Sequence, residues 1–197
     1  IIANLERLRW LDQQYPDRYL LVNIPSQKLW AVENGRAVHE MNVVVGKPSR
    51  ATKRFVTDVN GIRFNPSWNV PVSIKMKDFL PDLQENPYAL SDKGIEFVRG
   101  YGDEAVTLDP GSINWHAVTY ADMRQIRMVQ TPGDHNALGR IRVLMHNKYD
   151  IYLHDTNHKS LFNESTRAYS SGCIRMEDPE KIANFIHAIL CAKPCVN

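Results

Sequence analysis

Apolar and polar side chains alternate along the first part of the chain with a period of two, the spacing of a strand that is buried on one face. The run RYLLVNI places Leu20, Val22 and Ile24 on one such face. The run KLWAVENGRAVHEMNVVVG contains two more strand-like stretches, which meet at Asn34 and Gly35. Because Asn-Gly is favoured in two-residue hairpin turns, the sequence predicts that the domain opens with antiparallel β structure.

Two later stretches keep this β character. The run GIRFNPSWNVP is strand-like until Pro66 and Pro71 interrupt it, since proline cannot donate a hydrogen bond to a neighbouring strand. The run RIRVLMHNKYDIYLHDT predicts another hairpin, which turns around Asn147 and Lys148 and whose second strand ends near His154. We therefore expect a fold that is mixed α/β but mainly β.

A helical period replaces the alternation at both ends of the chain. We expect a leading helix over residues 1–17, followed by the main domain at 18–190. A second helix is predicted to begin at Asp178, an N-cap residue, with Pro179 at the first helical position, and a tail at 191–197 follows it. The apolar stripes of the two helices consist of Leu5, Leu8 and Leu11, and of Ile182, Phe185, Ile186 and Ile189.

The pattern changes between Ser73 and Val129, where short helix-like pieces replace the strands. Pro81 falls inside one of these pieces. One side of that piece consists of Met76, Phe79, Leu80 and Leu83. An insertion of this length between two sheet segments is unlike a structureless loop, so we interpret 73–129 as a partly helical lid or small subdomain.

Composition and charge exclude several classes of protein. With 197 residues and 43% hydrophobic positions the chain can bury one sizeable core, and its net charge of +2 gives no indication of a nucleic-acid partner. No run is apolar over the length of a membrane span, and the first residues lack the order of a signal peptide. Because the chain begins at Ile1 without Met, we expect it to be a piece of a longer chain.

Three cysteines are an odd number. Cys191 and Cys195 are close enough in sequence to pair, which would leave Cys173 as a free thiol and indicate an oxidising compartment. Three reduced cysteines in a cytosolic protein remain the alternative. Cys173 lies in the run YSSGCIRM, and a cysteine beside glycine is more often structural than catalytic.

A catalytic cysteine needs a base or positive charge near its thiol and donors for a developing oxyanion. His154, nineteen residues before Cys173, is a candidate base that a loop can bring back to the sheet. Gly172 allows close approach of the backbone, so the N–H groups of Gly172 and Cys173 are candidate oxyanion donors.

The motif IYLHDT, followed nineteen residues from its histidine by the cysteine of SSGCIRM, resembles the L,D-transpeptidase (YkuD-type) catalytic domain. The runs QTPGDHNALGRIRV, NPSWNVP and YLLVNIPSQKLWAVENG resemble the large peptidoglycan-cross-linking members of that family, so the resemblance covers about residues 19–186. It implies a β-sheet catalytic domain with flanking helices and an inserted lid that caps the substrate.

The resemblance also implies roles for single residues. Cys173 matches the nucleophile and His154 the base, while the backbone carbonyl of Asp155 matches the group that orients the imidazole. Many members carry a histidine two places before the cysteine, where this chain has Ser171. An oxyanion hole would then depend on the backbone around Gly172 rather than on a side chain at position 171.

The implied reaction joins two diaminopimelate residues of peptidoglycan stem peptides through a cysteine thioester, with release of D-alanine. It implies carbapenems as inhibitors, no cofactor, and a place in the periplasm or cell envelope, as part of a membrane-anchored or exported chain. Two other functions stay open: a cysteine hydrolase on the same fold, and a non-catalytic wall-binding module. A zinc site at His154 and His158 is disfavoured, because the residues between them are poor helix formers.

The candidate substrate-binding residues are Tyr152, Arg175, Ser171 and Trp68. Arg175 lies two residues after Cys173 and so shares its face on an extended chain, where it could bind a carboxylate or instead hold the cysteine loop. Trp68 could contact substrate or anchor the insertion, and Trp115 presents the same choice. The basic loop that contains Arg50 is interpreted as solvated.

Overall fold

The structure is a computed structural model that describes residues 15–192. The expected leading helix over residues 1–17 falls almost entirely outside the described residues, as does Cys195 and with it the expected pairing to Cys191. The strands are β1 (Arg18–Asn23), β2 (Lys28–Glu33), β3 (Arg36–Gly46), β4 (Val59–Phe64), β5 (Trp68–Asn69), β6 (Ile95–Arg99), β7 (Val106–Thr107), β8 (Ile126–Gln130), β9 (Ile141–Met145), β10 (Leu153–His154), β11 (Ala168–Ser170) and β12 (Ile174–Met176).

Helices are short except for the last one. The α-helices are α2 (Val72–Ile74), α3 (Leu80–Glu85), α4 (Tyr120–Gln125) and α5 (Pro179–Ala192), and a π-helical turn, η2 (Lys75–Phe79), joins α2 to α3. Short 3₁₀ turns are η1 (Pro48–Arg50), η3 (Ser91–Lys93), η4 (Gly102–Glu104), η5 (Pro110–Ser112) and η6 (Lys159–Asn163). Within the described part of the chain, every helix is too short or too polar to traverse a lipid bilayer.

One sheet of eight strands forms the larger part of the molecule, in the order β1-β2-β3-β12-β10-β9-β4, with β11 also paired to β3. The predicted hairpin at Asn34 and Gly35 is confirmed: β2 and β3 pair antiparallel, and both turn residues have the positive φ angles, 48° and 74°, of a tight hairpin turn. The predicted hairpin around Asn147 is confirmed as well, since β9 and β10 pair antiparallel.

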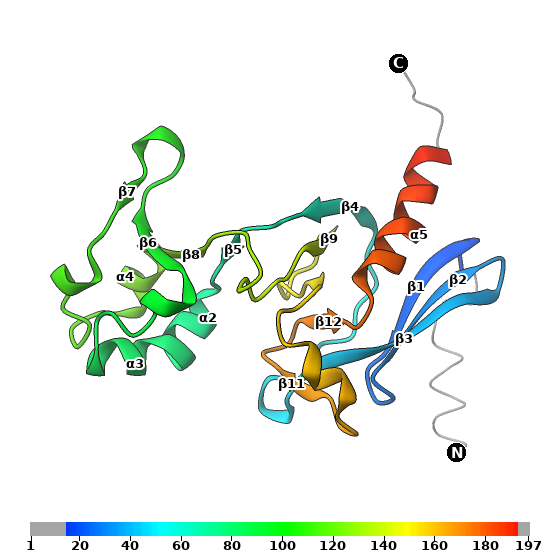
Figure 1. Cartoon of the computed structure of the whole chain (residues 1–197), viewed down its shortest axis with the longest axis horizontal. Helices are drawn as coiled ribbons and strands as arrows, with labels where there is room; N and C mark the ends of the chain where they lie inside the picture. Colours follow the sequence, from blue (N-terminus) through cyan, green and yellow to red (C-terminus); the bar gives the residue numbers. More distant parts are fainter. Residues whose placement is uncertain (1–14, 193–197) are drawn as a thin grey trace.

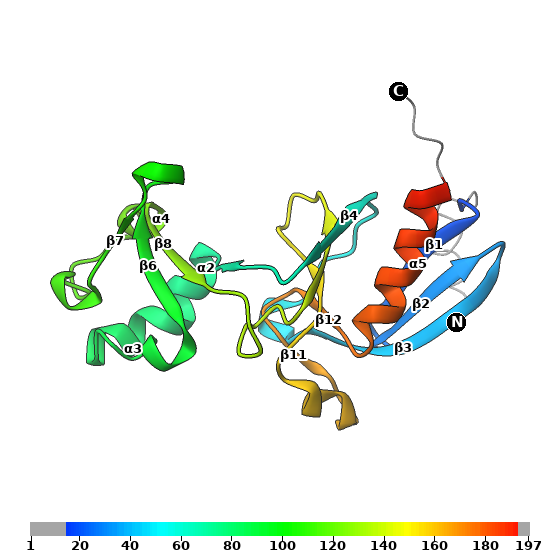
Figure 2. The same ribbon diagram turned by 45° about the horizontal axis from the view of Figure 1, so that its top comes forward.

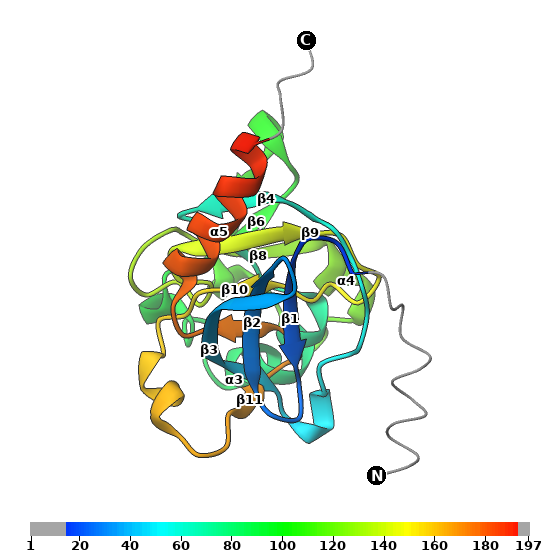
Figure 3. The same ribbon diagram turned by 90° about the vertical axis from the view of Figure 1, so that its right-hand side faces the viewer.

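Helix α5 covers one face of this sheet, as Figure 3 shows. Its predicted start is confirmed: the Asp178 carboxylate accepts a hydrogen bond from the Lys181 N–H at 3.2 Å. Ile182, Phe185 and Ile186 are buried in one core with side chains from the sheet. The helix runs to Ala192, so it includes the first two residues of the expected tail.

The second sheet lies where helix-like pieces were expected. Its order is β5-β8-β6-β7, and it forms one end of the molecule together with α2, α3 and α4 (Figures 1 and 2). We call residues 68–130 the inserted subdomain. The inserted segment is partly helical, as expected, but the strands β6 and β8 were not foreseen; both are only five residues long, and in each of them Ile, Phe or Met side chains at alternate positions are buried.

The inserted subdomain has a core of its own. Ten buried residues form it: Val70, Leu80, Leu83, Leu90, Ile95, Phe97, Trp115, Met123, Ile126 and Met128. Trp115 is 2% exposed, so of its two expected roles the structure supports packing. Pro81 does not break a helix, since it lies in the first turn of α3, where its missing N–H costs nothing.

Candidate active site

Along the neighbouring strands β10 and β12, successive side chains point alternately into the core and toward the candidate site. Parallel pairing of β10 and β12 sets Leu153 opposite Ile174, and both are buried in the core. Their neighbours therefore point to the opposite face of the sheet. The same register sets His154 beside Arg175, and Tyr152 beside Cys173, whose thiol accepts the Tyr152 N–H at 3.4 Å. His154 and Cys173 are thus diagonal neighbours on one face.

These residues line a cleft of about 750 Å³ between the large sheet and the inserted subdomain. On the side of the large sheet, the cleft is lined by six predicted site residues and by Ser170 next to them. The predicted six are Tyr152, His154, Ser171, Gly172, Cys173 and Arg175. Trp68 lines the cleft from the subdomain side and meets Phe79 edge-on at 6.3 Å between ring centroids. The structure therefore brings the four candidate substrate-binding residues to one cleft with Cys173.

The turn that carries Cys173 is held by bonds from side chains to the backbone. Ser170 Oγ accepts the Gly172 N–H at 3.1 Å and donates to the Cys173 carbonyl at 2.5 Å. Thr52 Oγ1 donates to the Gly172 carbonyl at 2.9 Å. Gly172 has φ +121°, which favours glycine at this position.

This network changes the expected set of oxyanion donors. The N–H of Gly172 donates to Ser170 Oγ, so it would have to leave that hydrogen bond to reach an oxyanion. Within residues 15–192, no acceptor takes the N–H of Cys173. That N–H and the Tyr152 N–H, which points at the thiol, are therefore the backbone donors nearest the reacting atom.

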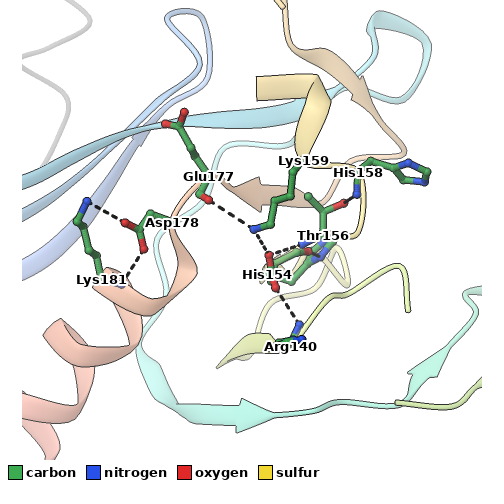
Figure 4. Close-up of polar contacts among 9 residues, drawn as sticks. Arg140, His154, Thr156, His158, Lys159, Glu177, Asp178 and Lys181 are labelled. Atoms are coloured by element: carbon green, nitrogen blue, oxygen red, sulfur yellow. Dashed lines mark hydrogen bonds and ion pairs between the residues drawn. The ribbon is translucent and has the colours of Figure 1, made fainter. Parts of the chain in front are cut away.

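His154 is oriented by its own backbone. Its Nδ1 bonds the Asp155 carbonyl, and because a carbonyl only accepts, Nδ1 carries the proton and the Nε2 lone pair stays available. Asp155 is not among the residues that line the cleft. Figure 4 shows Arg140, Thr156 and Lys159 grouped next to His154. The buried Asp155 carboxylate accepts from the Arg140 N–H at 2.9 Å, the Thr156 N–H at 2.7 Å and the Lys159 ammonium at 2.5 Å. Both groups of Asp155 therefore fix the segment that carries His154.

Burial keeps the thiol and the imidazole neutral at rest. Burial and then the positive charge of Arg175 lower the pKa of His154 to about 3. Burial raises the pKa of the Cys173 thiol, which the Tyr152 N–H and Arg175 only partly offset. A preformed thiolate–imidazolium pair is thus disfavoured, and His154 is poised to accept the thiol proton as the sulfur attacks.

Two arginines beside the pair have no carboxylate partner among the described residues. Arg142 on β9 and Arg175 on β12 flank His154 in register, and the Nε of each is buried without a hydrogen bond. The Arg142 guanidinium lies over the Tyr152 ring, 3.8 Å from its centroid. Sequence analysis missed Arg142, although a charged residue between Ile141 and Val143 on a strand was a usable signal.

A salt bridge between the sheet and the subdomain was also missed. Arg50 makes two parallel bonds to Asp78 on η2, at 2.5 and 2.8 Å, and its guanidinium donates to Ser171 Oγ at 2.9 Å. The interpretation of Arg50 as part of a solvated loop was therefore wrong. No sequence pattern relates residues 28 positions apart, so only the tertiary structure reveals this contact.

No group of histidine, cysteine, aspartate and glutamate side chains is arranged to hold a metal ion within the described range. His158 is exposed, and its N–H donates to Thr156 Oγ1 at 3.1 Å.

Comparison with known proteins gives a consistent result. Residues 17–189 match the family model "YkuD: L,D-transpeptidase catalytic domain". A Haemophilus influenzae protein described as "Putative L,D-transpeptidase" is 34% identical over 188 residues, which are 94% of this chain and 36% of the relative. The chain thus spans about a third of the length of that relative.

Two solved structures are also similar. The catalytic domain from an E. faecium L,D-transpeptidase acylated by ertapenem is 13% identical, with a TM-score of 0.46 over 89% of this chain and 92% of that one. The Ldtfm–avibactam carbamoyl enzyme is 13% identical, with a TM-score of 0.44 over 86% of this chain and 45% of that one.

Proposed function

The chain belongs to the YkuD family of L,D-transpeptidase catalytic domains, and on that premise we propose that it cross-links peptidoglycan stem peptides through a thioester on Cys173. The observation that carries the proposal is that one cleft contains both the Tyr152 N–H bonded to the Cys173 thiol and His154 paired with Arg175. This arrangement supplies a thiol, a base with a free lone pair, a backbone donor and a cation for substrate.

The first half-reaction forms the thioester. Cys173 Sγ attacks the carbonyl between diaminopimelate and the terminal D-alanine of a donor tetrapeptide, and its proton passes to His154 Nε2. The carbon–nitrogen bond then breaks, and the imidazolium returns the proton to the departing D-alanine amine. The N–H groups of Cys173 and Tyr152 are the proposed donors to the tetrahedral oxyanion.

The second half-reaction transfers the acyl group. The side-chain amine of diaminopimelate on another stem attacks the thioester, and its proton passes to His154. The carbon–sulfur bond breaks, Cys173 regains a proton, and a diaminopimelate-to-diaminopimelate link remains. Water in place of the amine would give a hydrolase, the second reaction that this site supports.

Arg175 is proposed to bind a substrate carboxylate. After burial, which has the larger effect, the charge of Arg175 lowers the pKa of His154 and so makes the imidazole a weaker base. A carboxylate bound to Arg175 would offset that charge, so the imidazole becomes more basic once substrate is in place. Tyr152 and Trp68 offer aromatic faces along the same cleft. Ser171 is proposed to position the turn through Arg50.

Product analysis tests the proposal. Purified tetrapeptide stems are incubated with the protein and with Cys173→Ala, and the products are identified by mass spectrometry. A cross-linked dimer that disappears in the variant is expected. Tripeptide alone indicates the hydrolase, and intact binding without turnover indicates a non-catalytic wall-binding module.

Carbapenem acylation gives a second test. We expect ertapenem to add its mass to Cys173, as the E. faecium relative is acylated by that compound. Simple alkylation is a poorer probe, because the raised pKa of the Cys173 thiol slows alkylation even of a true nucleophile. Cysteine-free protein that gains the same mass would contradict the assignment.

The proposed substrate places the domain outside the cytoplasm, in the periplasm or cell envelope, as part of a membrane-anchored or exported chain. The length of the curated relative supports a longer chain, since this one spans 36% of it. Fractionation of cells that produce the full-length protein, with immunodetection, tests this placement.

A further inference from the structure

Three cations line the wall of the cleft that faces Cys173 from the inserted subdomain. Lys75 lies on η2, Arg124 in the last turn of α4, and Arg127 on β8. None of the three is ion-paired to a carboxylate anywhere in residues 15–192. The two acids that line the cleft do not compensate them: Asp78 is paired with Arg50, and Asp150 lies on the side of Cys173.

Lys75 is 4% exposed, an unusual position for an ammonium group without a carboxylate. Its Nζ donates to the Met123 and Ile126 carbonyls at 2.7 and 2.6 Å. An ammonium has three N–H donors, so one remains without a protein acceptor. Burial, and then the charge of Arg127, lower the pKa of Lys75 to about 8, so it is mostly charged at neutral pH.

Arg127 is held rigidly without being neutralised. Its guanidinium donates to the Gly100 carbonyl and to Asn69 Oδ1, each at 3.0 Å, and lies 4.5 Å from the Tyr101 ring centroid. Three of its five N–H donors are left over. The Arg124 side chain is exposed and makes no hydrogen bond to a described residue.

Like charges held close together destabilise a fold, and such arrangements cluster at binding sites, where a ligand of opposite charge relieves the repulsion. Here the repulsion is direct, since Arg127 acts on Lys75, and free donors border the cleft. A planar carboxylate matches the shape of a guanidinium, so a carboxylate in the cleft would accept hydrogen bonds from both Arg127 and Lys75.

We propose that Lys75, Arg124 and Arg127 form a carboxylate-binding subsite on the inserted subdomain, which holds a second carboxylate of the peptide substrate across the cleft from Cys173. The inference rests on the proposed function, because stem peptides carry several carboxylates and can contact both walls. It gives the subdomain a direct part in substrate recognition, beyond covering the cleft.

Peptide binding tests the subsite without turnover. In the Cys173→Ala background, calorimetry compares a stem tetrapeptide with the same peptide whose carboxylates are all converted to amides. Arg124→Gln and Arg127→Gln should each weaken binding of the acid peptide by about tenfold and leave binding of the amide unchanged. The matched control is Lys77→Gln, which removes the same charge from an exposed position on η2 outside the cleft.

Arg124→Gln keeps the test independent of folding, since the Arg124 side chain is exposed and makes no hydrogen bond to a described residue. The subsite is overturned if parent protein binds acid and amide peptides equally or binds neither, or if the Arg124 and Lys77 variants behave alike. Ertapenem acylation of Cys173 is measured separately in each variant with the cysteine restored. Absence of acylation in parent protein refutes the proposed function, whereas Arg124 and Arg127 variants that keep the parent's preference for the acid peptide refute only the subsite.

Discussion

The salt bridge between Arg50 and Asp78 links the inserted subdomain to the cysteine turn, and its removal gives the sharpest prediction. The guanidinium bonds both carboxylate oxygens, and the side chains are 17% and 34% exposed. Pairs on the open surface contribute at most about 1 kcal/mol, and bonds to charged groups in drier places about 1.5–3 kcal/mol. For this half-buried pair we expect a coupling free energy of about 1–2 kcal/mol.

A double-mutant cycle measures that coupling. Arg50→Gln, Asp78→Asn and the double variant are unfolded in urea, and tryptophan fluorescence reports on the subdomain through Trp68 and Trp115. The difference between the double variant and the sum of the single variants gives the coupling. Arg18→Gln with Glu33→Gln is the matched control, because it breaks an ion pair within the large sheet.

The same variants are expected to slow acylation. Arg50 also donates to Ser171, two residues before the nucleophile, so loosening it disorders the turn and frees the subdomain together. A coupling of 1–2 kcal/mol corresponds to about a 5- to 30-fold change in equilibrium, and we expect a similar fall in the ertapenem acylation rate of Cys173. A coupling below about 0.3 kcal/mol, or acylation at the parent rate in Asp78→Asn, would refute the reasoning.

Three further predictions follow from the site and the cores. The unfolded His154 imidazole takes up a proton below about pH 6.5 but the folded one only near pH 3, so stability should fall as pH drops through this window, by up to about 1.4 kcal/mol per pH unit. Urea unfolding at several pH values measures this slope, which His154→Gln should reduce. Asp155→Asn should cost about 2 kcal/mol of unfolding free energy and slow acylation, since a neutral amide holds Lys159 and Arg140 less well; unchanged kinetics would limit the carboxylate to a structural role. Leu83→Ala should lower the unfolding free energy of the inserted subdomain by about 2–5 kcal/mol, because Leu83 is fully buried in its core. Leu21→Ala, at an exposed position, should cost far less in the same thermal unfolding assay.

Local patterns along the chain were sufficient for much of the fold. Asn34 and Gly35 predict their hairpin because few other residues adopt the positive φ angles that the turn requires. Asp178 and Pro179 predict the start of α5 for equally local reasons. The motif around His154 and Cys173 likewise identified the family, because its residue types and spacing are readable in one dimension.

Other features depend on which strands become neighbours. β10 and β12 pair in parallel, and that register alone sets His154 beside Arg175 and Cys173 beside Tyr152. The sequence likewise gives no sign of three contacts in the site. These are the hydrogen bond from the Gly172 N–H to Ser170, the salt bridge from Arg50 to Asp78, and the repulsion between Arg127 and the buried Lys75. Each arises when distant segments share one low-dielectric space, where hydrogen bonds and charges act over a few ångströms. The sequence therefore determined the elements and the reactive pair, and only the tertiary structure decided their electrostatic environment and the cationic wall that faces them.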